Sequence, residues 1–148
     1  MKSKNIYLAA EGSAKDWEEA IQLCGKYMRD KGSVNQEFTD ACIEREKEYP
    51  TGLPADIPVA IPHSKANGIQ ENCICFLRLD QPVRFYRMDD GDEFVDTKLV
   101  FNLAIKQADE HLEFLQKLMQ FVLNKDIMEK CSSLPMDKIP KLLEEELG

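Results

Sequence analysis

The chain has 148 residues, of which 43% are apolar and 31% charged, and its formal net charge is −8 at pH 7. This length and composition are typical of a folded globular protein that buries a core without disulfide or metal staples. The acidic balance argues against sequence-independent nucleic-acid binding, and the absence of a long apolar run or apolar signal core predicts a cytoplasmic protein without membrane insertion.

The first third of the sequence predicts one strand and two helices. Residues 5–9 form a short apolar run that fits a strand. Apolar residues recur at helical spacing over residues 17–28, which predicts a helix with Ser13 as its N-cap. A second helix is expected to begin after Asn35 and to be stopped by Pro50.

The apolar pattern changes to short strand-like runs in the middle of the chain and returns to helical spacing afterwards. Strands are predicted over residues 59–61, 73–79, 83–87 and 97–105, and helices from Asp109 onward and over 136–147. No linker separates these elements. We therefore expect a single domain over residues 1–148 with an α/β fold, a mixed β-sheet flanked by helices.

Five cysteines raise the question of disulfides or metal binding. Their number is odd, and Cys24 and Cys42 fall on apolar helix faces, which indicates reduced, buried thiols. Cys73 and Cys75 form a C-x-C motif, but no second pair accompanies it and the surrounding alternation fits a buried strand. No metal site is predicted.

The two histidines are candidates for proton or phosphoryl exchange. His63 follows Pro62 at the C-terminal end of a short apolar strand, where functional side chains often lie in α/β folds. A surface-loop histidine without a role fits the same context. His111 lies in the first turn of the helix that follows residues 97–105, where a neutral imidazole is favoured. A solvent-facing residue is the alternative there.

Arg45 is the candidate anion ligand. It stands near a helix end and the Pro50-Thr51-Gly52 turn, where a guanidinium could bind phosphate with two N–H groups. A surface ion pair with Glu44 or Glu48 explains the same sequence.

Four short motifs occur in a familiar order: Arg45-Glu46, Thr51-Gly52, Ile61-Pro62-His63 and His111-Leu112. From about Glu11 to the C-terminus the chain resembles the enzyme IIA domain of the fructose/mannitol class (type 2) of the bacterial sugar phosphotransferase system. The Tyr-Pro-Thr-Gly-Leu-Pro stretch and the Asp-Asp-Gly-Asp turn make it most similar to the galactitol-like branch.

The resemblance implies the fructose/mannitol-type enzyme IIA fold and a phosphotransferase role through a phosphohistidine. His63 would accept phosphate from the phosphocarrier protein HPr and pass it to a IIB domain, which serves a membrane IIC transporter for a carbohydrate such as galactitol or a related polyol. Arg45 and His111 would stabilise the phosphoryl group in flight, without metal or cofactor. Many members have Gly after the active histidine, whereas this chain has Ser64.

A regulatory reading of the same fold stays open. In a module like the nitrogen-type paralogue, phosphorylation would control binding to another protein and would feed no transporter.

Overall fold

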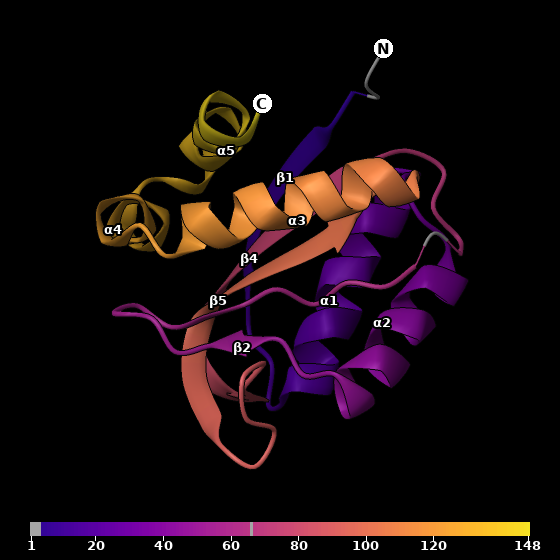
Figure 1. Ribbon diagram of the computed structural model, residues 1–148. Coiled ribbons are helices and arrows are strands. Elements are labelled where there is room, and N and C mark those ends of the chain that lie inside the picture. The colour runs from indigo at the N-terminus through magenta and orange to yellow at the C-terminus, as the bar shows by residue number, and fades with distance from the viewer. Residues whose placement is uncertain (1–3, 66) are drawn as a thin grey trace.

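A five-stranded mixed β-sheet lies at the centre of the computed structural model, which describes residues 4–65 and 67–148 (Figure 1). The strands are β1 (Ile6–Gly12), β2 (Gly52–Leu53), β3 (Val59–Ala60), β4 (Cys73–Tyr86) and β5 (Phe94–Ala104). Their order across the sheet is β1-β4-β5-β3-β2. β1 runs parallel to β4 and β3 parallel to β5, whereas β4 and β5 are antiparallel, as are β2 and β3. The predicted mixed sheet is confirmed.

Helices cover both faces of this sheet. They are α1 (Trp17–Asp30), α2 (Gln36–Glu48), α3 (Ala108–Val122), α4 (Lys125–Ser133) and α5 (Ile139–Leu147), with a 3₁₀ turn at Met136–Lys138. One apolar core joins α1 and α2 to the sheet, and a second joins α3, α4 and α5 to the opposite face (Figure 1). The result is a helix–sheet–helix sandwich. No helix in the described ranges is long and apolar enough to cross a bilayer.

The cysteine prediction is confirmed in β4. Cys73 and Cys75 are fully buried and face α1 and α2, while Ile74 between them faces the other core. A central strand covered on both faces needs this continuous apolar sequence. All five cysteines are buried free thiols.

Two predicted boundaries are wrong. Asp16, not Ser13, caps α1, because its carboxylate accepts the N–H of Glu19 at 2.8 Å while the Ser13 hydroxyl donates to Asp80. The two strands predicted over 73–79 and 83–87 form one strand, β4, with a register shift in its ladder to β5 between Arg78 and Val83.

Two short elements escape the sequence patterns. β2 has only two residues, too few to show alternation, and it lies where we expected the turn after α2. α4 is a polar nine-residue helix between α3 and the predicted last helix, and the side chain of Asn124 caps it by accepting the N–H of Ile127. Its buried residues, Met128 and Cys131, are too few to give a clear helical period.

Candidate functional site

The segment from β3 to His63 stays hydrogen-bonded to the sheet. After Ala60 it continues beside β5, where the N–H of Leu103 donates to the carbonyl of Pro62 at 3.0 Å and His63 forms an isolated parallel bridge to Leu103. Because β3 and β5 are parallel, their carboxyl ends lie at the same edge of the sheet. His63 therefore lies at this edge, at the end of the strand, as the sequence predicted.

The ring of His63 is held by one backbone contact. Its Nδ1 lies 2.7 Å from the carbonyl oxygen of Ile61, and the residue is only 5% exposed. Since a carbonyl oxygen can only accept, Nδ1 carries the proton and Nε2 carries the lone pair. Burial lowers the pKa of His63 to about 4, with Arg45 and His111 adding to the shift and the Ile61 contact opposing it. The imidazole is thus neutral near pH 7.

His111 lies beside it, at the start of α3. The backbone N–H of His111 donates to the carbonyl of Gln107 at 2.9 Å. The centroids of the His63 and His111 imidazole rings are 5.3 Å apart. Burial, with a smaller contribution from Arg45, lowers the pKa of His111, in agreement with the neutral ring expected at a helix N-terminus. Its buried Nε2 has no hydrogen-bond partner among the described residues.

Arg45 reaches the same place from the last turn of α2. Its guanidinium carbon lies 5.1 Å from the centroid of the Tyr49 ring, and its buried Nε has no hydrogen-bond partner within residues 4–65 and 67–148. Glu44 pairs with Lys47 at 3.3 Å, and neither it nor Glu48 forms an ion pair with Arg45 in the part of the chain that the structure describes. The surface ion-pair reading is therefore wrong.

A cleft of about 500 Å³ brings the three predicted residues together. Its lining is Arg45, His63, Ser64, Lys65, Asn67, Ile105, Lys106, Ala108 and His111. Buried N–H groups without partners are costly unless a ligand satisfies them. Arg45 contributes such an N–H, and the unpartnered Nε2 of His111 adds a second when it carries the proton of the neutral ring, so the cleft suits an anion with several acceptor oxygens.

A second hollow of about 400 Å³ adjoins the cleft and shares Arg45 and His63 with it. Tyr49, Leu115 and Met119 contribute apolar surface to this hollow. Leu115 and Met119 are half-buried on α3 and also pack against the second apolar core, whereas Leu112 on the same helix is 61% exposed. The sequence signal for this hollow was the width of the apolar stripe on α3. The stripe is wider than one buried helix face requires, so some of its residues are left at the surface.

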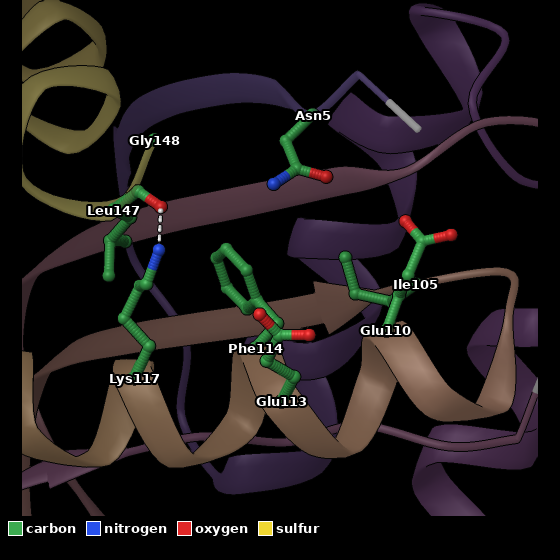
Figure 2. A pocket seen from close by; sticks show the side chains of 8 residues that line it. All are labelled: Asn5, Ile105, Glu110, Glu113, Phe114, Lys117, Leu147 and Gly148. Atoms are coloured by element: carbon green, nitrogen blue, oxygen red, sulfur yellow. Dashed lines mark hydrogen bonds between the residues drawn. The ribbon is translucent and has the colours of Figure 1, made fainter. Parts of the chain in front are cut away.

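A separate, smaller cavity of about 100 Å³ lies between α3, α5 and the start of β1 (Figure 2). There Nζ of Lys117 donates to the carbonyl of Leu147 at 3.2 Å, and Glu110 and Glu113 complete a polar lining. None of the three predicted site residues lines it. Among the described residues, no group of three or more His, Cys, Asp or Glu side chains is arranged to hold a metal ion.

The neutral state of His63 is directly measurable. We expect an NMR titration of the imidazole to show a pKa near 4, so that the ring stays neutral at about pH 6, where an exposed histidine is mostly protonated. The protonated nitrogen should be Nδ1. Protonation of the ring with a pKa near the ordinary 6.5 would contradict the buried geometry.

The comparisons with known proteins identify the family and the fold. Residues 1–145 match the sequence model of the family described as "Phosphoenolpyruvate-dependent sugar phosphotransferase system, EIIA 2". The galactitol-specific EIIA component of Escherichia coli is 32% identical to this chain over 132 residues, which cover 88% of this chain and 87% of that protein.

Two solved structures share the fold. Nitrogen regulatory protein IIA-Ntr from Neisseria meningitidis superimposes with a TM-score of 0.75 at 25% identity and covers 93% of this chain and 96% of its own. The complex of enzyme IIAMTL and phosphorylated enzyme IIBMTL from Escherichia coli matches with a TM-score of 0.72 at 24% identity over 90% of each chain. The predicted enzyme IIA fold is confirmed.

Proposed function

Because the chain belongs to the EIIA 2 family of the phosphoenolpyruvate-dependent sugar phosphotransferase system, we propose that its His63 carries a phosphoryl group between two partner proteins. The family assignment confirms the resemblance found in the motifs. One observation carries the proposal: the contact of Nδ1 with Ile61 leaves Nε2 of a neutral His63 as the nucleophile, in a cleft that Arg45 and His111 also line.

The transfer needs only groups that the cleft supplies. The lone pair on Nε2 attacks phosphorus and forms the P–N bond, while the bond from phosphorus to the donor breaks and its electron pair stays with the donor. The phosphoryl group in flight spreads negative charge over its equatorial oxygens. The guanidinium of Arg45 and an N–H of His111 stabilise that charge where it develops. The second transfer reverses these events toward the acceptor.

The proposed partners follow from the family. HPr donates the phosphoryl group, and a IIB domain receives it and serves a membrane IIC transporter. The galactitol-specific relative supports galactitol or a related polyol as the transported carbohydrate. We propose that residues 1–148 act as one enzyme IIA domain on the cytoplasmic side of the membrane, with the apolar hollow beside His63 as part of the docking surface.

A regulatory role is the second candidate. The likeness to nitrogen regulatory protein IIA-Ntr, at a TM-score of 0.75, favours it. In that case phosphorylation of His63 would change the binding of another protein, and no IIB domain would receive the phosphate.

Stepwise transfer assays test the proposal. We expect the purified chain to take up one acid-labile phosphate from phospho-HPr and to lose it when a candidate IIB domain is added. HPr without phosphate is the matched control. A chain that takes up no phosphate would overturn the proposal, whereas a stable phosphoprotein that no IIB domain discharges would favour the regulatory role.

A further inference from the structure

A buried carboxylate lies next to the arginine of the site. Glu46 is only 5% exposed, and it follows Arg45 in the last turn of α2. Its Oε2 accepts the N–H of Thr51 at 2.7 Å, and its Oε1 accepts the Thr51 hydroxyl at 2.9 Å. Burial raises the pKa of Glu46 to about 7, while the two Thr51 contacts and Arg45 oppose that shift. Burial removes water from the carboxylate, which costs free energy, and the two Thr51 donors offset part of that cost.

These contacts continue, bond by bond, to the reacting histidine. The carbonyl of Thr51 accepts the N–H of Ile61 at 3.3 Å, which extends the β2–β3 pairing by one residue. The carbonyl of Ile61 in turn contacts Nδ1 of His63 at 2.7 Å. The contact that fixes the tautomer of His63 therefore depends on where Glu46 holds Thr51.

The neighbouring contacts leave little freedom elsewhere in this segment. The carbonyl of Gly52 accepts the N–H of Met88 at 2.8 Å, and a Cβ added at Gly52 would lie 2.7 Å from the carbonyl oxygen of Tyr86. On the other side, Nδ2 of Asn102 donates to the carbonyl of Pro62 at 3.0 Å. The turn between α2 and β2 is the part of this segment that these contacts do not fix. The hydrogen bonds from Thr51 to Glu46 hold that turn.

We propose that Glu46 and Thr51 are positioning residues for phosphoryl transfer, because their paired hydrogen bonds fix the Thr51 carbonyl and, through Ile61, the orientation of the His63 ring. The same turn joins α2, which carries Arg45, to the strands that lead to His63, so the pair also sets the spacing between guanidinium and nucleophile. This inference rests on the proposed function of His63.

Loss of the pair should affect chemistry more than docking. Neither side chain lines the cleft at His63. Thr51 does line the adjoining hollow, but it is only 1% exposed and so offers a docking partner almost no surface. Without the Thr51 hydroxyl or the Glu46 carboxylate, Ile61 is less firmly held and the His63 ring samples orientations in which Nε2 does not face the donor. A nucleophile displaced by a fraction of an ångström reacts more slowly even when the partner binds normally.

Four variants separate positioning from general stability. Thr51→Val removes the hydroxyl donor, and Glu46→Gln places an amide where one carboxylate oxygen stood. Thr51→Ser restores the hydroxyl and should recover the activity. Thr39→Val is the matched control, because Thr39 is equally buried, at 1% exposure, and its hydroxyl oxygen accepts from Arg29 at 3.0 Å, away from the cleft.

The expected result is a kcat for phosphorylation by phospho-HPr that falls about tenfold in Thr51→Val and Glu46→Gln, with KM nearly unchanged. Thr51→Ser and Thr39→Val should remain near wild type. NMR titration of the unphosphorylated protein should show, in the first two variants only, a His63 proton less confined to Nδ1 and a His63 pKa moved further down from about 4. The reason is that the Ile61 contact opposes the effect of burial on this pKa.

The two readouts distinguish the possible failures. Wild-type kcat and an unchanged His63 titration in Thr51→Val and Glu46→Gln would overturn the positioning role, as would equal losses in Thr39→Val. If even the wild-type chain takes up no phosphate, the proposed function fails, and the titration alone still decides whether Glu46 and Thr51 hold the ring. Should Glu46→Gln not fold, Thr51→Val and Thr51→Ser provide the same comparison.

Discussion

His63→Ala is expected to abolish phosphorylation of the chain by phospho-HPr. The variant lacks Nε2, the proposed nucleophile, whose lone pair is kept free because Nδ1 is engaged with Ile61. No acid-labile phosphate should be found on the protein by radiolabel or intact-mass measurement, even after long incubation. The backbone pairing of Pro62 with Leu103 does not involve the imidazole, so the variant should remain folded.

His111→Ala serves as the matched histidine variant. It removes the group proposed to contact the phosphoryl oxygens but leaves the proposed nucleophile in place, so it should still reach one phosphate per chain, at a lower rate. Full phosphate incorporation in His63→Ala, or its complete loss in His111→Ala alone, would mean that the acceptor has been assigned to the wrong ring.

Arg45→Lys is expected to slow phosphoryl transfer about 100-fold, because an ammonium cannot replace two N–H donors aimed at neighbouring oxygens. Among the described residues neither Glu44 nor Glu48 forms an ion pair with the guanidinium, and the Nε–H of Arg45 has no hydrogen-bond partner, so this donor is available to a phosphoryl group. Single-turnover transfer from phospho-HPr measures the effect. The loss should appear mainly in the rate of transfer rather than in KM.

Arg29→Lys is the control for the same change of side chain. Its guanidinium donates to the Thr39 hydroxyl and does not line the cleft, so transfer should proceed at the wild-type rate. An Arg45→Lys protein as fast as the wild type would leave Arg45 with a structural role only.

The larger elements of the fold were predictable because their signals are local. The helical spacing over residues 17–28 predicted α1, and the alternation around Cys73 and Cys75 predicted the buried part of β4. Pro82 lies between the two strands predicted over residues 73–79 and 83–87, and β1 pairs with β4 only as far as Leu79. Beyond that point no strand among residues 4–65 and 67–148 pairs with this edge of β4, and a residue without an N–H is tolerated there. Periodicity cannot show where a neighbouring strand ends.

The candidate site was only partly predictable. The context of His63 at a strand end was visible in the sequence, yet it fitted a functional and an idle histidine equally well until the ordered motifs were compared with a family. Glu46 and Thr51 stood inside those motifs without an assigned role. Their contact joins the end of a helix to the start of a strand across a turn, and no pattern of residue types specifies that two such groups meet.

The sequence by itself determined the α/β class, the buried thiols and the family to which the chain belongs, because apolar period and ordered motifs are properties of neighbouring residues. Only the tertiary structure decided that Arg45, His63 and His111 line one cleft, that Nδ1 rather than Nε2 of His63 carries the proton, and that Glu46 is held by Thr51. The reason is physical: tautomer, pKa and hydrogen-bond partner depend on burial and on the distances between groups in space, and tertiary packing sets both.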